Sequence, residues 1–271
     1  MAQRIKVGRA ESLAIDFFLS GLSGMESGFD VVNLPRGSGI EAVRSGAVEM
    51  ALVTALSVIA DPDRLEVVPA VALSSWRYPF AQLFLPGGLD SSPERICYAR
   101  GDSTEADIAR ILLKEHYRIA VPLEPCDAVT GDETASLRVG NSVPTMRFDG
   151  LRLDLGQEWY ELAAYPMAWG VFVMRKGAVT PPIVLGLREM VERTELIRVQ
   201  WADSVDRSES MRRFFIDDVR LRFDELVVAS ISELMHYAFY YDLTDEIREF
   251  PMASVEIDEP GEANPGRTPL L

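Results

Sequence analysis

The sequence predicts an α/β protein built from two lobes, with a ligand cleft between them. Strand-like and helical segments alternate over residues 5–53, and a second run of this kind covers residues 95–162. Alternation with short links is typical of a parallel sheet wrapped by helices. A long apolar segment at residues 169–175 is expected to form a strand that returns to the first half.

The first run has the order strand, helix, strand, helix, strand. Residues 5–9, 29–34 and 48–53 are the expected strands, and the last is almost entirely apolar, which indicates burial on both faces. Residues 12–22 carry apolar side chains at helical spacing, and residues 39–46 form a short helical segment that ends at a glycine.

The second run is less regular. Asp102 or Ser103 followed by Glu105 is a helix-start signal, and Asp154 precedes another short helix near its positive end. The expected elements from residue 61 onward are a loop that leads into a strand at 67–73, strands at 80–85 and 95–99, a helix from Asp102 or Ser103 to residue 117, a strand at 126–132, an irregular excursion at 140–153 and a helix at 156–162.

The last third is expected to be helical, at residues 181–194, 208–215 and 224–241, with a short final helix at 245–250. The domain interpretation assigns residues 1–83 and 174–255 to lobe 1, 84–173 to lobe 2, and 256–271 to a disordered tail that is rich in proline and glycine. Ligands in such folds lie outside the carboxyl ends of strands, which here include residues 8–12, 54–57, 100–104 and 131–132.

Charge and hydropathy exclude some partners. The formal net charge is −15, from 27 basic and 42 acidic residues, so we expect no binding to nucleic acid. No apolar run reaches the about 18 residues of a membrane helix, and the first residues lack a secretory signal, so we expect a cytoplasmic protein with no membrane partner. Only three of the basic residues are lysine, which fits either adaptation to salt or a codon bias.

The sequence offers little for metal or cofactor binding. Its two cysteines, Cys97 and Cys126, are too few for a disulfide framework. No two cysteine or histidine residues lie at the short spacing of a zinc site of the CxxC type. The motifs of serine hydrolases, zinc proteases, phosphate loops and dinucleotide-binding folds are absent. We therefore expect no metal, no nucleotide cofactor and no flavin.

Several segments, in this order along the chain, resemble the menaquinone-biosynthesis family that contains chorismate dehydratase and dihydroxynaphthoate synthase. They are VGRAESL at residues 7–13, the segment 39–53, ALSS at 72–75, Thr104 with RILL at 110–113, CDAVTGD at 126–132, DLGQEW at 154–159 and YPMAWGVFVMR at 165–175. The resemblance covers residues 4–250, and the Asp-Leu-Gly-x-x-Trp piece is its most specific part. The dehydratase branch fits better, mainly because of Gly8 and Arg9.

The resemblance implies a type II periplasmic-binding-protein-like fold with a central ligand cleft. It also implies removal of water from chorismate, to give an enolpyruvyl benzoate on the futalosine route to menaquinone, without a cofactor. The partner would be a small carboxylic acid such as chorismate. The aromatic end of segment 224–241 is expected to pack on the first lobe, with a homodimer face as the alternative.

The substrate-binding candidates are hydroxyl, arginine and carboxylate side chains, because helix starts and arginine hold carboxylates well. They are Arg9, Ser12, Ser75, Arg77, Ser103, Thr104 and Asp132. Helix capping, surface ion pairs and a solvated turn are the structural alternatives for these residues.

Two positions depart from the dehydratase pattern. Ala14 stands where that family has an asparagine, and Ala81 stands where it has a second serine, and alanine does neither acid–base chemistry nor hydrogen bonding. Glu11 is the candidate base in their place. Three interpretations stay open: a chorismate dehydratase that uses Glu11, an enzyme of the family with another carboxylic substrate, and a protein that only binds its ligand. An aromatic cleft of Trp76, Tyr78, Trp169 and Phe172 would favour the last.

Overall fold

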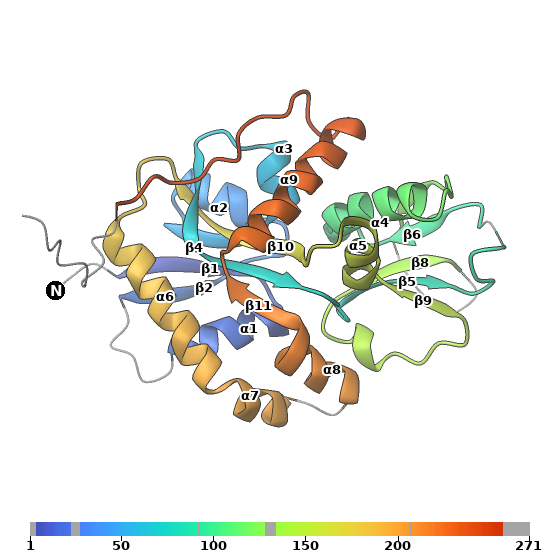
Figure 1. Cartoon of the computed structure of the whole chain (residues 1–271), viewed down its shortest axis with the longest axis horizontal. Helices are drawn as coiled ribbons and strands as arrows, with labels where there is room; N and C mark the ends of the chain where they lie inside the picture. The colour runs from blue at the N-terminus through green and yellow to red at the C-terminus, as the bar shows by residue number, and fades with distance from the viewer. Residues whose placement is uncertain (1–3, 23–27, 92, 128–133, 206–207, 257–271) are drawn as a thin grey trace, which may run out of the picture.

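The computed structural model describes residues 4–22, 28–91, 93–127, 134–205 and 208–256. It contains a six-stranded sheet and a five-stranded sheet, each covered by helices, in two lobes (Figure 1). The predicted α/β class and two-lobed arrangement are confirmed.

The six-stranded sheet of lobe 1 has the order β11-β4-β10-β3-β1-β2. Its parallel part, β1, β2 and β3, matches the predicted strand–helix alternation, and Val7 of β1 is paired with Met50 of β3. The elements are β1 (Ile5–Arg9), α1 (Leu13–Leu19), a 3-10 turn (Ser20–Leu22), β2 (Phe29–Asn33), α2 (Gly39–Ser45), β3 (Met50–Thr54), α3 (Ala55–Ala60) and β4 (Leu65–Ser75). Gly46 ends α2 in the left-handed region, with φ of 77°.

The five-stranded sheet of lobe 2 has the order β7-β6-β8-β5-β9, and helices α4 and α5 pack on it. Its elements are β5 (Ala81–Leu85), β6 (Ile96–Tyr98), a 3-10 turn (Arg100–Asp102), α4 (Ser103–Glu115), β7 (Leu123–Pro125), β8 (Ser136–Val139), a 3-10 turn (Val143–Thr145), β9 (Leu151–Asp154) and α5 (Leu155–Ala163). The strand expected at 126–132 lies earlier in the chain, as β7, and residues 128–133 are outside the described residues.

The chain then returns to lobe 1 through β10 (Met167–Arg175), as predicted. This strand is antiparallel to β3 and β4 and is buried along almost its whole length. The remaining elements are α6 (Pro181–Leu196), α7 (Arg198–Val205), α8 (Glu209–Arg213), a π-helical turn (Phe214–Asp218), β11 (Val219–Arg222) and α9 (Glu225–Tyr240). The elements expected from the sequence do not include α3, α7, β8, β9 and β11. β9 lies at the end of the segment 140–153 that was expected to be irregular, and the helix expected at 245–250 is irregular chain.

The two lobes are joined by two short crossings, since β5 and β9 belong to the second sheet and β4 and β10 to the first. The expected lobe boundaries after residues 83 and 173 therefore fall inside β5 and β10, a few residues from the crossings. The tail expected at 256–271 lies outside the described residues except for Glu256.

Helix α9 packs against α3 and β10 of lobe 1. The aromatic end of segment 224–241 also contacts lobe 2, contrary to the expectation of packing on lobe 1: Tyr237 lies edge-on to Trp159 of α5, and the Tyr241 hydroxyl donates a hydrogen bond to Glu115 of α4. Phe239 and Tyr240 are exposed there, and a homodimer face at this place stays a prediction. Within the described part of the chain, no helix combines the length and apolar character needed to cross a bilayer.

The two cysteines form a single crosslink. Cys97 of β6 and Cys126, directly after β7, are disulfide-bonded with their Cα atoms 5.6 Å apart. The bond joins the ends of two neighbouring parallel strands of lobe 2. The sequence excludes a framework of several disulfides, but the count of two did not show that these cysteines meet.

Candidate functional site

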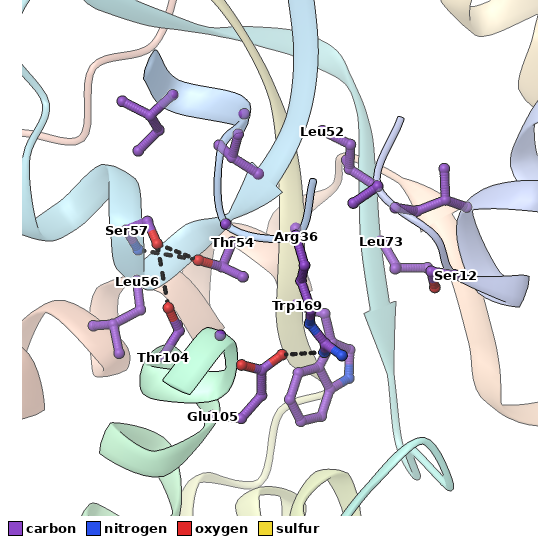
Figure 2. Close-up of a pocket in the computed structure, with 18 of the residues that line it drawn as sticks. Ser12, Arg36, Leu52, Thr54, Leu56, Ser57, Leu73, Thr104, Glu105 and Trp169 are labelled. Atoms are coloured by element: carbon purple, nitrogen blue, oxygen red, sulfur yellow. Dashed lines mark hydrogen bonds and ion pairs between the residues drawn. The ribbon is translucent and has the colours of Figure 1, made fainter. Parts of the chain in front are cut away.

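A pocket of about 150 Å³ lies between the two lobes, at the carboxyl ends of β1 and β3 (Figure 2). Its walls are formed by the chain segments after these strands and by the start of α4. These segments correspond to three of the four strand ends predicted to hold a ligand, at residues 8–12, 54–57 and 100–104. The polar or glycine residues that line it are Gly8, Glu11, Ser12, Arg36, Gly37, Gly39, Thr54, Ser57, Tyr78, Gly101, Thr104, Glu105, Trp169 and Gly170.

Three hydroxyl groups form a chain across the pocket wall. Thr54 precedes α3, and its Oγ1 accepts a hydrogen bond from Ser57 N at 3.4 Å, which caps the helix. The Ser57 hydroxyl lies 2.5 Å from Thr54 Oγ1 and 3.4 Å from Thr104 Oγ1 (Figure 2). Because Thr104 belongs to α4, this chain of hydroxyl groups joins lobe 1 to lobe 2.

A second connection between the lobes is ionic. Arg36 lies in the loop between β2 and α2, and its Nη2 is 3.1 Å from Glu105 Oε1 while its Nε is 3.3 Å from Asp102 Oδ1. Among the described lining residues, Arg36 is the basic side chain of the pocket. Burial lowers the pKa of Arg36, but Glu105 and Asp102 outweigh it and raise the pKa above its ordinary value.

The carboxylates beside Arg36 are themselves buried. Burial raises the pKa of Asp102 to about 6, although Arg36 opposes this shift. Asp102 precedes α4 without capping it through its side chain, since that side chain is turned to Arg36. The start of α4 therefore presents acidic groups to the loop of the other lobe.

Two aromatic rings form the floor of the pocket. Tyr78 and Trp169 are stacked, with ring centroids 4.1 Å apart, and Trp169 Nε1 donates a hydrogen bond to Ser75 Oγ at 2.8 Å. Burial, with a contribution from Glu105, raises the pKa of Tyr78 to about 12, so this residue stays a neutral phenol. The other two expected aromatics lie elsewhere, Trp76 against Tyr160 and Phe172 against Phe18.

The Asp-Leu-Gly-x-x-Trp piece is structural, and it places Tyr78. Asp154 Oδ1 accepts hydrogen bonds from the backbone N–H of Tyr78 at 2.7 Å, and of Gly156 and Gln157 at 2.9 and 3.1 Å. A Cβ at Gly156 would lie 2.7 Å from Tyr78 N, so only glycine lets α5 come this close to the segment that joins β4 to β5. Trp159 is fully buried and donates to Ser230 Oγ at 3.2 Å.

The structure brings three of the predicted site residues together around the pocket: Glu11, Ser12 and Thr104. Arg9 is not among the lining residues, because side chains alternate along a strand and its neighbour Gly8 faces the pocket. Arg9 Nη2 instead pairs with Asp16 at 2.5 Å.

The remaining predicted residues lie away from the pocket lining. Ser75 is buried and accepts the hydrogen bond from Trp169, and Ser103 is exposed at the start of α4. Arg77 lies near Asp218: burial raises the pKa of Asp218, and Arg77 opposes this shift. Asp132 lies outside the described residues. Ala14 and Ala81 are fully buried and do not line the pocket, so neither position presents a polar group to it.

Sequence reasoning missed the two charged residues at the centre of the site. Glu105 was interpreted only as a helix-start signal, and Arg36 carried no signal at all. Their proximity depends on the approach of two lobes rather than on local spacing. Among the described lining residues there is no histidine or cysteine, so the side-chain atoms in the pocket that could ligate a metal ion are carboxylate and hydroxyl oxygens.

Comparison with solved structures shows the fold. Protein AF1704 from Archaeoglobus fulgidus is 17% identical, with a TM-score of 0.63 over 89% of this chain and 99% of that one. The periplasmic aliphatic sulphonate binding protein SsuA from Escherichia coli is 13% identical, with a TM-score of 0.61 over 97% and 99%. An ABC transporter structure from Parabacteroides distasonis is 12% identical, with a TM-score of 0.63 over 95% and 100%.

These similarities establish a two-lobed, periplasmic-binding-protein-like fold for the chain. A comparison with curated proteins gives no match. The family described as "Menaquinone biosynthesis" matches residues 5–247, which is most of the chain and includes both lobes and the whole pocket. The protein therefore belongs to the menaquinone-biosynthesis family.

Proposed function

We propose that the protein is a chorismate dehydratase-like enzyme of the futalosine route to menaquinone. Family membership supports a role in menaquinone biosynthesis. The observation that carries the finer proposal is the placing of Arg36, Glu11 and Glu105 around one pocket between the lobes. A cation, carboxylates and hydroxyl groups in one enclosed place are what elimination of water from a dicarboxylic acid requires.

Arg36 is the residue that would hold a carboxylate of the substrate, because guanidinium and carboxylate groups form two parallel hydrogen bonds. In this structure its partners are Glu105 and Asp102, so a substrate carboxylate competes with them. The hydroxyl group of Thr104, at the start of the long helix α4, and that of Ser57 in α3 together offer a second place for an anionic group.

Glu11 is the proposed base. It removes the hydrogen from the ring carbon that carries the enolpyruvyl ether, and the hydroxyl group leaves from the neighbouring ring carbon. The electrons of the C–H bond form the new double bond that completes the aromatic ring, and the proton and hydroxide together make one water molecule. Glu105 lines the same pocket but is paired with Arg36, which favours a positioning role for it.

The alternative is a diverged homologue that binds a small carboxylic acid without converting it. The burial of Ala14 and Ala81 favours this alternative, because the pocket has no polar group from the positions where the dehydratase pattern has them. The stacked Tyr78 and Trp169 offer a flat apolar wall that suits simple binding. The name of the neighbour SsuA describes it as binding aliphatic sulphonates, which are also small anions.

The test is turnover of chorismate by the purified protein, at low and at high salt because of the net charge of −15. Loss of chorismate absorbance, with a product lighter by one water, is the expected result. Folded protein that gives no turnover but is stabilised by chorismate in a thermal shift supports the binding alternative. Folded protein with neither turnover nor a shift overturns both.

A further inference from the structure

A group of three metal-ligand side chains lies on lobe 2, outside the pocket. His116 directly follows α4, and Glu158 and Glu161 belong to α5, the helix that packs beside α4 (Figure 1). One nitrogen or oxygen atom of each of these three residues lies within 4.8 Å of the others. His116 Nε2 is 3.6 Å from Glu161 Oε2 and 4.0 Å from Glu158 Oε2.

The helices themselves produce this arrangement. Residues three apart lie on the same face of a helix, so Glu158 and Glu161 both face the end of α4. Cysteine and histidine spacing does not reveal this group, because only one of its members is a histidine and the two carboxylates come from another helix. It is therefore outside the reasoning by which the sequence predicts no metal.

Neighbouring side chains hold the two carboxylates in place. The Tyr117 hydroxyl donates a hydrogen bond to Glu158 Oε2 at 2.5 Å, and Gln157 Nε2 donates to Glu161 Oε1 at 3.0 Å. Hydrogen bonds of this kind to ligand side chains are typical of metal sites, where they fix the orientation of the ligands.

The charge of the group is not balanced by arginine or lysine. Among the described residues, the only ion-pair partner of Glu158 and Glu161 is His116, although Glu158 has only 7% of its side chain exposed. A buried carboxylate close to a second one gains most from a divalent cation.

We propose that His116, Glu158 and Glu161 bind one Zn²⁺ ion between the end of α4 and α5, with water as the fourth ligand. An imidazole with two carboxylates suits this cation, and bonds of about 2.0–2.1 Å at tetrahedral angles separate ligand atoms by about 3.3 Å. The separations of 3.6 and 4.0 Å from His116, and the spread of the three atoms within 4.8 Å, exceed this value, so binding of the ion requires the side chains to move closer together.

The bound ion would join α4 to α5 at the end of α4 opposite the pocket, since Thr104 and Glu105 lie at its other end. Its role is therefore to stabilise lobe 2, and it takes no part in the proposed reaction. Zn²⁺ binding at this place is independent of the proposed function of the pocket.

The experiment uses the untagged full-length chain, treated with chelator and then titrated with Zn²⁺ by calorimetry. Excess Mg²⁺ and high salt suppress diffuse binding to an acidic surface. We expect one Zn²⁺ per chain and a higher melting temperature when it is bound. His116→Ala and Glu161→Gln should each weaken binding at least about tenfold.

The chain offers a matched control, because its second histidine, His236, is exposed on α9 and is not a member of the group. His236→Ala should bind Zn²⁺ as the unaltered protein does. Replacing Zn²⁺ by Co²⁺ should give the visible absorption of a four-coordinate site, and His116→Ala should abolish it. Absence of stoichiometric binding, or equal affinity in the His116→Ala and His236→Ala variants with unchanged circular dichroism, overturns the proposal.

Discussion

Arg36 and Glu105 come from different lobes, yet Arg36 Nη2 lies 3.1 Å from Glu105 Oε1 inside the wall of the pocket. The same arginine contacts Asp102, so one guanidinium group faces two acidic residues at the start of α4. A ligand carboxylate at this place replaces an interaction that already exists. Affinity is therefore the difference between two ion pairs and not the full strength of one.

Arg36→Ala should weaken chorismate binding by at least about tenfold, because the pocket loses the guanidinium group that would bind a carboxylate of the substrate. It should also lower the free energy of unfolding by about 1–3 kcal/mol, since Asp102 and Glu105 lose their counter-ion. Calorimetry and urea unfolding measure the two effects. Arg44→Ala is the control, because Arg44 pairs with Asp61 at the surface of lobe 1 and does not line the pocket. Equal binding by the two variants contradicts the role of Arg36.

Glu11→Gln should lower kcat for chorismate by a factor of about 10² to 10⁴ and leave KM almost unchanged, as expected for loss of a base. Glu105→Gln should mainly change KM, because it removes one of the two acidic partners of Arg36 and leaves Asp102. Steady-state kinetics separate the two. Glu192→Gln, an exposed position on α6, should leave both constants as they are. A kcat for Glu11→Gln equal to that of Glu192→Gln contradicts the proposed base.

Asp102 should make stability depend on pH between about 4 and 6. Burial raises its pKa from an ordinary value of 3.8 to about 6 in the folded protein, so the folded state binds the proton more tightly than the unfolded state. Its contribution to stability is therefore present at low pH and is lost as pH rises through about 6.

The measurement compares the unaltered protein with Asp102→Asn by urea unfolding at pH 4.5 and pH 7. The variant should gain stability relative to the unaltered protein as pH rises, by on the order of 1–3 kcal/mol. Asp149→Asn, an exposed aspartate of lobe 2, should show no such relative gain. A constant difference for Asp102→Asn across this pH range contradicts the assignment.

Asp154→Ala should cost about 2–4 kcal/mol of stability, because it removes a helix cap and leaves the N–H of Tyr78 without its acceptor. Asp154→Asn keeps an acceptor oxygen and should cost less than half as much. Asp224→Ala, which removes the cap of α9 and the ion pair with Arg220, should cost about 1–2 kcal/mol. Equal losses at the two caps would show that the bond to Tyr78 contributes nothing.

The disulfide between Cys97 and Cys126 closes a loop with a sequence separation of 29, which should stabilise the oxidised protein by about 3 kcal/mol. Dithiothreitol should therefore lower the melting temperature by several degrees, and it should have no effect on a Cys97→Ser, Cys126→Ser variant. The cytoplasmic location expected from the sequence predicts that both thiols are reduced in the cell. Thiol labelling in lysate under non-reducing conditions measures the state directly.

The fold could be predicted largely because its signals are local. The strands and helices around Val7, Met50 and Val171 show their period within a few residues, and the helix stop at Gly46 acts on its own segment. Helix α3 was missed because the apolar strand β3 passes into it at Thr54 without a break in hydropathy. β8, β9 and β11 are strands of four residues, too short for a clear alternation.

The site could be predicted only in part. Glu11, Ser12 and Thr104 follow strand ends, so the rule about carboxyl ends finds them. Arg36 and Glu105 are 69 positions apart and meet only because the lobes close on each other. Ser57 and Thr104 also come from different lobes, so the sequence does not show that their hydroxyl groups meet. For Thr104 the sequence offers helix capping as an equally good explanation.

The path of β4 and β10 has a consequence for synthesis on the ribosome. These neighbouring strands of the central sheet have all of the second sheet between them in the sequence. Both neighbours of β4 in the sheet, β10 and β11, follow lobe 2 in the sequence, so both edges of β4 stay unpaired in the nascent chain until these strands have been translated, whereas lobe 2 is complete once α5 emerges. We expect lobe 2 to reach its native state first, and the unpaired edges of β4 to be the part of the chain that a chaperone protects in the meantime.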